Sequence, residues 1–232
     1  AGLPEISLDL IYGLPGSTVE TWERTLEAAL ALRPDHLSAY LLTLEGNVPM
    51  QRQVEAGALR LPDEETAREQ YDRLLAWTAQ AGLAQYEISN FARPGSECRH
   101  NENYWLRGEY LGLGPSAHSH RSGRRYANPA SLDTWGSRLR AGRLPADPPE
   151  EASAHAAAAE WVFLGLRRNE GVPWQAWRDA LPDAGAAARF EARARELAAL
   201  GLLEEREARL RLAPGARFIS NAVFTELLAA LD

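Results

Sequence analysis

Apolar and polar positions along the first forty residues predict a strand, a helix and a second strand. Residues 6–12 alternate with a period of two, which is typical of a strand. The helix is expected over about 17–32, opened by a capping box of Ser17 and Glu20. A second strand follows over 36–44. Two strands joined by one helix form a βαβ unit, so they are expected to be parallel.

The strand at 6–12 carries a carboxylate at its centre. Ser7, Asp9 and Ile11 share the face opposite the one that carries Leu8. An acid inside a sheet is unfavourable unless it is paired or bound to something polar. The pattern alone leaves two interpretations of Asp9 open, an acid bonded to neighbouring backbone or to an arginine, and a contact to a ligand in a cavity.

Both strands end in loops that are candidates for a ligand site. The sequence GLPG follows the first strand at 13–16, and Glu45-Gly46-Asn47 follows the second. In parallel α/β structures, ligands bind at the carboxyl ends of the strands. A helix is then expected over about 63–81, a short strand over 86–89, and a loop-rich polar and aromatic stretch over 90–126.

The last third of the chain changes to alanine, glutamate, arginine and leucine after a proline-rich linker at 142–150. Its pattern predicts a winged-helix-like module of helices and one hairpin: helices over about 151–168, 173–181, 186–200 and 217–231, and hairpin strands over 202–205 and 209–212. Arginines of the third helix are offset by glutamates, which is typical of a solvated face and disfavours a phosphate-binding track.

Composition, net charge and cysteine content exclude several classes of protein and of binding partner. The chain has 232 residues, 45% of them hydrophobic and 25% charged, which is ordinary for a globular protein. A net charge of −7 gives no general attraction to nucleic acid or to anionic membranes. The single cysteine, Cys98, excludes a disulfide framework. No segment has the length and apolarity of a transmembrane helix. The opening residues suggest a fragment that lacks an N-terminal part.

Histidines are the main candidates for metal or haem chemistry. His36 and His155 lie in a predicted strand and a predicted helix, where a structural or exposed role is the simpler interpretation. His100, His118 and His120 lie in the polar stretch. His100 near a cysteine suits a metal or haem iron, but no four-ligand zinc spacing is present, and from spacing alone a hydrogen bond that fixes a loop is the simpler interpretation.

Several long motifs together resemble one family. These motifs are DLIYGLPG at 9–16, PDHLSAY at 34–40, YEISNFARPG at 86–95, HNENYW at 100–105 and GLGPSAHS at 112–119. They are similar to radical S-adenosylmethionine proteins of the oxygen-independent coproporphyrinogen III oxidase type. The HNxxYW sequence resembles the haem-chaperone branch, HemW. The resemblance covers essentially the whole chain.

The resemblance implies an α/β fold, namely the C-terminal part of a partial (β/α)6 barrel followed by a helical winged-helix-like domain. It implies domains at 1–145 and 150–232. The family binds S-adenosylmethionine and a [4Fe–4S] cluster through a CxxxCxxC loop, which this chain lacks, so the cluster ligands are expected upstream and this chain contributes no metal ligand.

For the site residues, the resemblance implies S-adenosylmethionine contacts by Asp9, Thr43 and His118. It implies haem contact by His100, with Cys98 as a second candidate. Asp9 is thereby favoured as a ligand contact over a paired acid.

The expected function is haem binding and delivery to acceptor haemoproteins in the cytoplasm. The alternative is an enzyme, an oxygen-independent coproporphyrinogen III oxidase that forms vinyl groups by radical decarboxylation. No nucleic-acid partner and no integral membrane segment are expected, and a homodimer is an assembly that the sequence leaves open.

Overall fold

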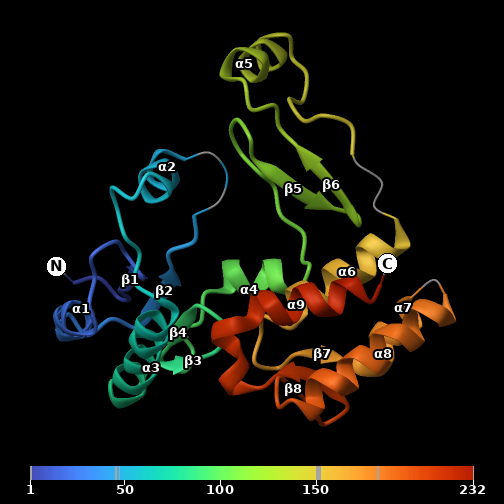
Figure 1. Ribbon diagram of the computed structural model, residues 1–232. Helices are drawn as coiled ribbons and strands as arrows, with labels where there is room; N and C mark the ends of the chain where they lie inside the picture. Colours follow the sequence, from blue (N-terminus) through green and yellow to red (C-terminus); the bar gives the residue numbers. More distant parts are fainter. Residues whose placement is uncertain (1, 45, 47, 150–152, 182, 232) are drawn as a thin grey trace. The chain divides into compact units, whose positions relative to one another are not determined.

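The computed structural model describes residues 2–44, 46, 48–149, 153–181 and 183–231. The chain forms two compact units, Ala1–Cys98 and Arg99–Asp232 (Figure 1). The linker expected at 142–150 lies inside the second unit, and the division into domains 1–145 and 150–232 stays a prediction.

A mixed sheet organises the first unit. Its strand order is β1-β2-β4-β3, with β1 at Ser7–Tyr12, β2 at His36–Leu41, β4 at Asn90–Ala92 and β3 at Ala84–Gln85. Strands β1 and β2 are parallel, as the βαβ pattern predicts. Strand β4 runs antiparallel to both of its neighbours. The described residues of this unit therefore form an open mixed sheet and no closed barrel.

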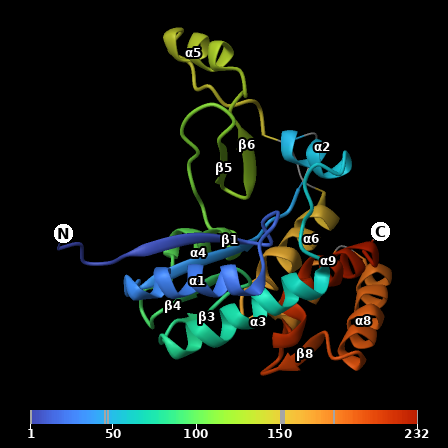
Figure 2. The same cartoon turned by 60° about the vertical axis from the view of Figure 1, so that its left-hand side comes forward.

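Two helices pack on one face of this sheet, α1 at Val19–Ala31 and α3 at Glu64–Gln80 (Figure 2). The core between them is apolar, and its most enclosed side chains have no solvent exposure: Leu26, Leu37, Leu74 and Phe91. Burial of this kind stabilises by roughly 1.5–3 kcal/mol for each large side chain. A short helix, α2 at Pro49–Glu55, follows the loop after β2.

Three local expectations for this unit are wrong. The cap of α1 is Thr18, which exchanges hydrogen bonds with Thr21, because helical geometry begins one residue later than the Ser17 pattern suggests. Strand β2 ends at Leu41, before the predicted limit of 44. The stretch 86–89 is the connection between β3 and β4 and not a strand, since the Tyr86 amide bonds back to the Asn90 carbonyl.

The stretch that was expected to be loop-rich contains regular elements of the second unit. These are α4 at Arg99–Trp105, β5 at His118–Arg121 and β6 at Arg124–Ala127, followed by α5 at Leu132–Arg140. Strands β5 and β6 form a hairpin. Ser122 and Gly123 both have positive φ at its tip, as a two-residue hairpin turn of this hand requires.

The rest of the second unit confirms the winged-helix-like pattern. Its elements in order are α6 at Ala154–Gly165, β7 at Val172–Pro173, α7 at Trp174–Ala180, α8 at Ala184–Ala199, β8 at Leu203–Arg206, β9 at Arg209–Leu212, a 3-10 helix η1 at Pro214–Ile219 and α9 at Ser220–Ala229. The three-stranded sheet has the order β7-β9-β8. Its core includes Trp177, Phe190 and Leu227, which have no solvent exposure. The predicted helix start at 151 lies outside the described residues.

Among the residues that the structure describes, no helix is long and apolar enough to cross a membrane.

Candidate functional site

The face of the first sheet that α1 and α3 do not cover is polar. The register of β1 on β2 places Ser7 opposite His36 and Asp9 opposite Ser38. The register of β2 on β4 places Asn90 opposite Ser38 on the same face. Side chains alternate along a strand, so the apolar partners of these residues point to the helices. One side of the sheet thus forms the core, and the other presents hydrogen-bonding groups.

His36 links three parts of this polar face. One ring nitrogen lies 2.9 Å from the Ser7 hydroxyl, and the other lies 2.9 Å from the Tyr86 hydroxyl. Tyr86 in turn accepts a hydrogen bond from the Cys98 amide at 3.2 Å. Burial lowers the pKa of His36 below its ordinary value, although the carboxylates of Asp9 and Glu97 oppose that shift. His36 is therefore a structural histidine, as the pattern indicates.

Asp9 lies beside this network with an exposed side chain. It has no hydrogen bond or ion pair to any residue that the structure describes, so the paired-acid interpretation finds no partner here. An exposed carboxylate on a polar face can accept hydrogen bonds from hydroxyl groups or pair with an ammonium group. Both groups occur in S-adenosylmethionine, and the donor set therefore fits that ligand. Thr43 is also exposed, and its hydroxyl donates to the Leu41 carbonyl at 3.4 Å.

Gln70 of α3 fixes the loop at 13–16 by hydrogen bonds. Its side chain is fully buried. Its side-chain oxygen accepts from the Gly13 amide at 2.9 Å. Its side-chain nitrogen donates to the Ser17 hydroxyl and to the Thr18 carbonyl, each at 3.2 Å. This loop is thus fixed at the carboxyl end of β1, where the fold places ligands. Of the second predicted loop, Glu45 and Asn47 lie outside the described residues.

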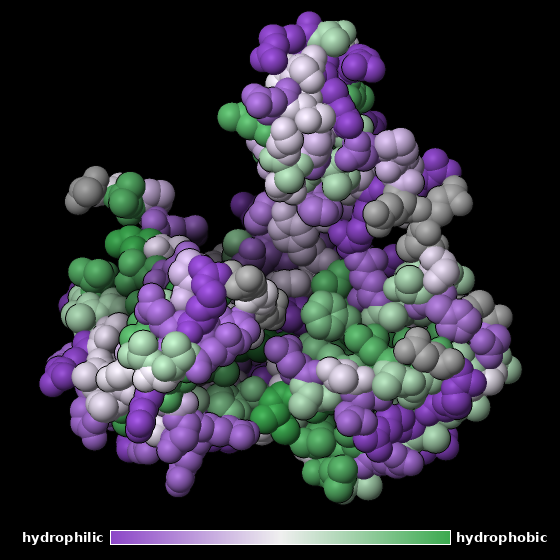
Figure 3. Space-filling model, turned by 45° about the horizontal axis from the view of Figure 1, so that its top comes forward, coloured by the Kyte–Doolittle hydropathy of each residue, from purple (hydrophilic) through white to green (hydrophobic). Residues whose placement is uncertain are grey.

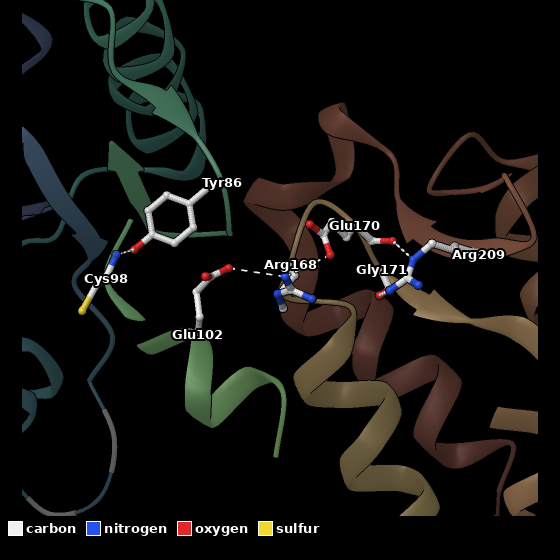
Figure 4. A network of polar contacts seen from close by, with 7 residues as sticks. All are labelled: Tyr86, Cys98, Glu102, Arg168, Glu170, Gly171 and Arg209. Atoms are coloured by element: carbon white, nitrogen blue, oxygen red, sulfur yellow. Dashed lines mark hydrogen bonds and ion pairs between the residues drawn. The ribbon is translucent and has the colours of Figure 1, made fainter. Parts of the chain in front are cut away.

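Cys98 is partly buried at the end of the first unit. Its amide binds Tyr86, while its thiol points away from the tyrosine ring (Figure 4). No metal-binding group of three His, Cys, Asp or Glu side chains occurs in the described part of the chain. With one cysteine in its sequence, this chain does not contain a three-cysteine ligand set for a [4Fe–4S] cluster.

In the second unit, the HNxxYW sequence forms α4, and its aromatic rings continue into the following loop. The ring of His100 meets Tyr104 edge-on at 4.8 Å, and Tyr104 meets Tyr110 at 4.5 Å. Tyr110 forms a two-hydrogen-bond bridge with the backbone of His120. His100 is exposed, whereas His120 is buried and its Nδ1 lies 3.0 Å from the Gly108 carbonyl. His100 is thus the histidine of this row that a ligand can approach.

Arginines attach α4 and its loop to α6 and the residues after it. The guanidinium of Arg167 lies over the Trp105 ring at 4.6 Å, which is within the range of a cation–π contact. Arg168 pairs with Glu102 at 3.4 Å and with Glu170 at 3.0 Å (Figure 4). These contacts fix the HNxxYW helix on the winged-helix-like module within one compact unit.

Ion pairs and a hydrogen bond also fix the segment that follows α4. Glu160 pairs with both Arg107 and Arg125, and Arg125 also donates to the Tyr110 hydroxyl at 2.8 Å. Burial lowers the pKa of Arg107, and the neighbouring Arg125 lowers it further.

His118 opens β5 and is exposed. Its backbone pairs with Ala127. Asp9 and Thr43 belong to the first unit and His118 to the second, so their grouping around one ligand stays a prediction. Haem contact by His100 and Cys98 also stays a prediction, because Cys98 belongs to the first unit and His100 to the second.

Sequence patterns missed two groups that shape these surfaces. Gln70 is distant in sequence from the loop that it binds. The only sequence signal of this contact is a polar glutamine at a core position of α3. The pattern predicts a strand at Tyr86, whereas in the structure its hydroxyl joins His36 to the Cys98 amide just before α4.

Comparisons with known proteins agree on one family. The HemN C-terminal domain matches residues 152–219. The chain is 37% identical over 227 residues to a protein of Mycobacterium tuberculosis named heme chaperone HemW, covering 98% of this chain and 56% of that protein. It is 31% identical over 230 residues to heme chaperone HemW of Bacillus subtilis, covering 99% of this chain and 60% of that protein.

A solved structure shows the same fold. Coproporphyrinogen III oxidase (HemN) from Escherichia coli, described as a radical SAM enzyme, matches all of this chain and 55% of its own, with a TM-score of 0.75 and 19% identity. The chain therefore spans a little over half the length of these relatives and has the fold of the C-terminal part of HemN. We conclude that the chain belongs to the HemW branch of the radical S-adenosylmethionine proteins.

Proposed function

We propose that the protein containing this chain binds haem and delivers it to acceptor haemoproteins. The observation that supports this most strongly is the identity of 31–37% to proteins named heme chaperone HemW over nearly the whole chain. The exposed His100 within the HNxxYW helix supplies an imidazole that haem iron can bind. Haem is here the cargo, and the protein's task is to hold it and release it.

S-adenosylmethionine is the proposed resident ligand of the first unit, with Asp9 and Thr43 as contacts and His118 as a further contact from the second. Asp9 supplies an exposed acceptor on the polar face, where His36, Ser38 and Asn90 are buried. The network of Ser7, His36 and Tyr86 fixes the strand beside it. The [4Fe–4S] cluster of the family would be held by residues outside this chain, and it would supply electrons to S-adenosylmethionine.

A cytoplasmic location, a haemoprotein as acceptor and the possibility of a homodimer complete the proposal. A nucleic-acid partner is not part of it, because the chain as a whole carries a net charge of −7.

Titration with haemin tests the central claim. The protein is expected to bind haemin with a shifted Soret band, and His100→Ala is expected to alter that spectrum or weaken binding. His155→Ala is the control, because His155 is a partly exposed histidine of α6, in the same unit, and pairs with Asp183. A protein that bound no haemin but converted coproporphyrinogen to protoporphyrinogen would overturn the proposal in favour of the oxidase.

Asp9→Asn tests the S-adenosylmethionine contact separately. It is expected to weaken S-adenosylmethionine binding measured by calorimetry while haemin binding is unchanged. If Asp9→Asn and the parent protein bind S-adenosylmethionine with equal affinity, Asp9 is not a contact of this ligand.

A further inference from the structure

A strongly basic segment lies within this acidic chain. Residues 118–143, which comprise the β5–β6 hairpin and α5 and are called the basic arm below, contain six arginines and one acidic residue. The arm therefore has a net charge of +5, whereas the whole chain has −7. Its surface mixes hydrophilic and apolar side chains (Figure 3). A concentration of guanidinium groups of this kind favours anionic ligands.

A cavity lies at the base of the basic arm, with a volume of about 340 Å³. Its lining combines apolar, aromatic and charged side chains: Glu109, Tyr110, Leu111, His120 and Arg121. Leu111 is 70% exposed, so this apolar side chain contributes little to the core. The cavity is continuous with the HNxxYW helix through Tyr110, whose ring contacts Tyr104.

Most polar groups of the lining already have partners. The Glu109 carboxylate accepts from the Ser122 amide at 2.7 Å, and the His120 ring bonds to the Gly108 carbonyl. The Tyr110 hydroxyl accepts from Arg125. Arg121, in contrast, has no hydrogen bond or ion pair from its guanidinium to any residue in the described ranges. The cavity therefore presents one guanidinium without a partner among the described residues, together with the Glu109 carboxylate and apolar and aromatic surface.

We propose that this cavity binds one edge of a carboxylate-bearing porphyrin, with Arg121 pairing with a propionate group. The proposal rests on haem binding as the function above and names the residues that hold the ligand's anionic edge. A porphyrin is a flat apolar ring whose propionates leave from one side. Tyr110 and Leu111 supply the apolar contact, and a guanidinium matches the geometry of a carboxylate with two parallel hydrogen bonds.

The volume of this cavity is sufficient to enclose part of a porphyrin. Ligand cavities usually measure about 300–1,000 Å³, so a cavity near the lower limit takes part of a porphyrin and leaves the rest accessible. Partial enclosure is compatible with cargo that must pass to another protein.

The experiment compares haemin with haemin dimethyl ester, in which both propionates are neutral. Dissociation constants are measured by absorbance titration for the full chain and for Arg121→Gln. The control is Arg140→Gln, which removes the same charge from another exposed arginine of the basic arm, on α5. Leu111→Ala probes the apolar contact, and because Leu111 is 70% exposed the variant is expected to fold as the parent does.

We expect Arg121→Gln to weaken haemin binding by about tenfold or more, as the loss of a charged hydrogen bond implies. Binding of the ester is expected to be weaker than that of haemin in the parent and unchanged by Arg121→Gln. Leu111→Ala is expected to weaken both ligands alike, and Arg140→Gln to change neither by more than about twofold.

Three results would overturn the inference. If haemin binds but Arg121→Gln and Arg140→Gln behave alike, the cavity assignment fails while haem binding stands. If the ester binds the parent as tightly as haemin, no propionate pairing occurs. If the parent binds no haemin at all, the proposed function fails and the cavity assignment fails with it.

Discussion

The buried glutamine beneath the loop at 13–16 offers the sharpest test of the first unit. Gln70→Met removes three side-chain hydrogen bonds, those to the Gly13 amide, the Ser17 hydroxyl and the Thr18 carbonyl. Methionine has a similar volume, so little cavity is created. The Trp22 indole bonds to the backbone carbonyl of Gln70 and is retained.

The expected loss follows from these contacts. Each hydrogen bond contributes about 1 kcal/mol net, and a buried amide left without a partner costs about 1–3 kcal/mol. Gln70→Met should therefore lower the free energy of unfolding by about 2–4 kcal/mol, or the melting temperature by about 4–16 °C. Gln70→Glu keeps the acceptor for the Gly13 amide but loses the donor to the Thr18 carbonyl and buries a carboxyl group, so its loss should be no smaller than that of Gln70→Met.

The assay is urea unfolding followed by circular dichroism, with calorimetry for the melting temperature. Gln80→Met, at the exposed end of the same helix, is the control and should change stability by less than about 0.5 kcal/mol. A loss below about 0.5 kcal/mol for Gln70→Met, or an equal loss for Gln80→Met, would refute the reasoning that this side chain holds the loop.

Three further changes probe other parts of the chain. Gly13→Ala should destabilise more than Gly16→Ala in urea unfolding, because both have positive φ but only the new Cβ at Gly13 would meet a leucine methyl, at 2.6 Å; equal losses would show that the contact relaxes freely. Since burial lowers the folded-state pKa of His36, the unfolded state binds more protons near its ordinary pKa, so stability should fall as pH drops below about 6.5. The variant His36→Asn should weaken that fall, and an identical pH profile would exclude His36 as its source. Trp177→Ala should cost about 3–5 kcal/mol, because the side chain is fully buried, whereas Leu200→Ala, 70% exposed, should cost far less; a small loss for Trp177→Ala would contradict its place at the centre of the module.

Repeating patterns predicted the larger elements well. The βαβ unit, α3 and the winged-helix-like module all appear where apolar periodicity places them. Such elements bury a continuous apolar stripe, which leaves a signal that can be recognised from spacing alone. Short elements leave a weaker signal. The connection at 86–89 was mistaken for a strand because four residues of mixed character fit both a strand and a turn.

For the candidate sites, too, sequence reasoning predicted the contact residues but not the distant residues that support them. The family resemblance selects Asp9, Thr43, His100 and His118, which are exposed in the structure, and Cys98, which is partly buried. Spacing could not identify their supports, since Gln70, which holds the loop at 13–16, is more than fifty residues away from it in the chain.

The sequence by itself determined the family, the helix–strand order of both ends of the chain, and the polar character of one face of β1. These depend on the local alternation of residue types and on long motifs. Only the tertiary structure decided that Asp9 has no partner among the described residues, that His36 is tied to Ser7 and Tyr86, and that Arg121 lies at a cavity beside Tyr110. Those facts depend on which distant segments meet. Contacts between distant segments are set by packing of the whole unit, and no local pattern records them.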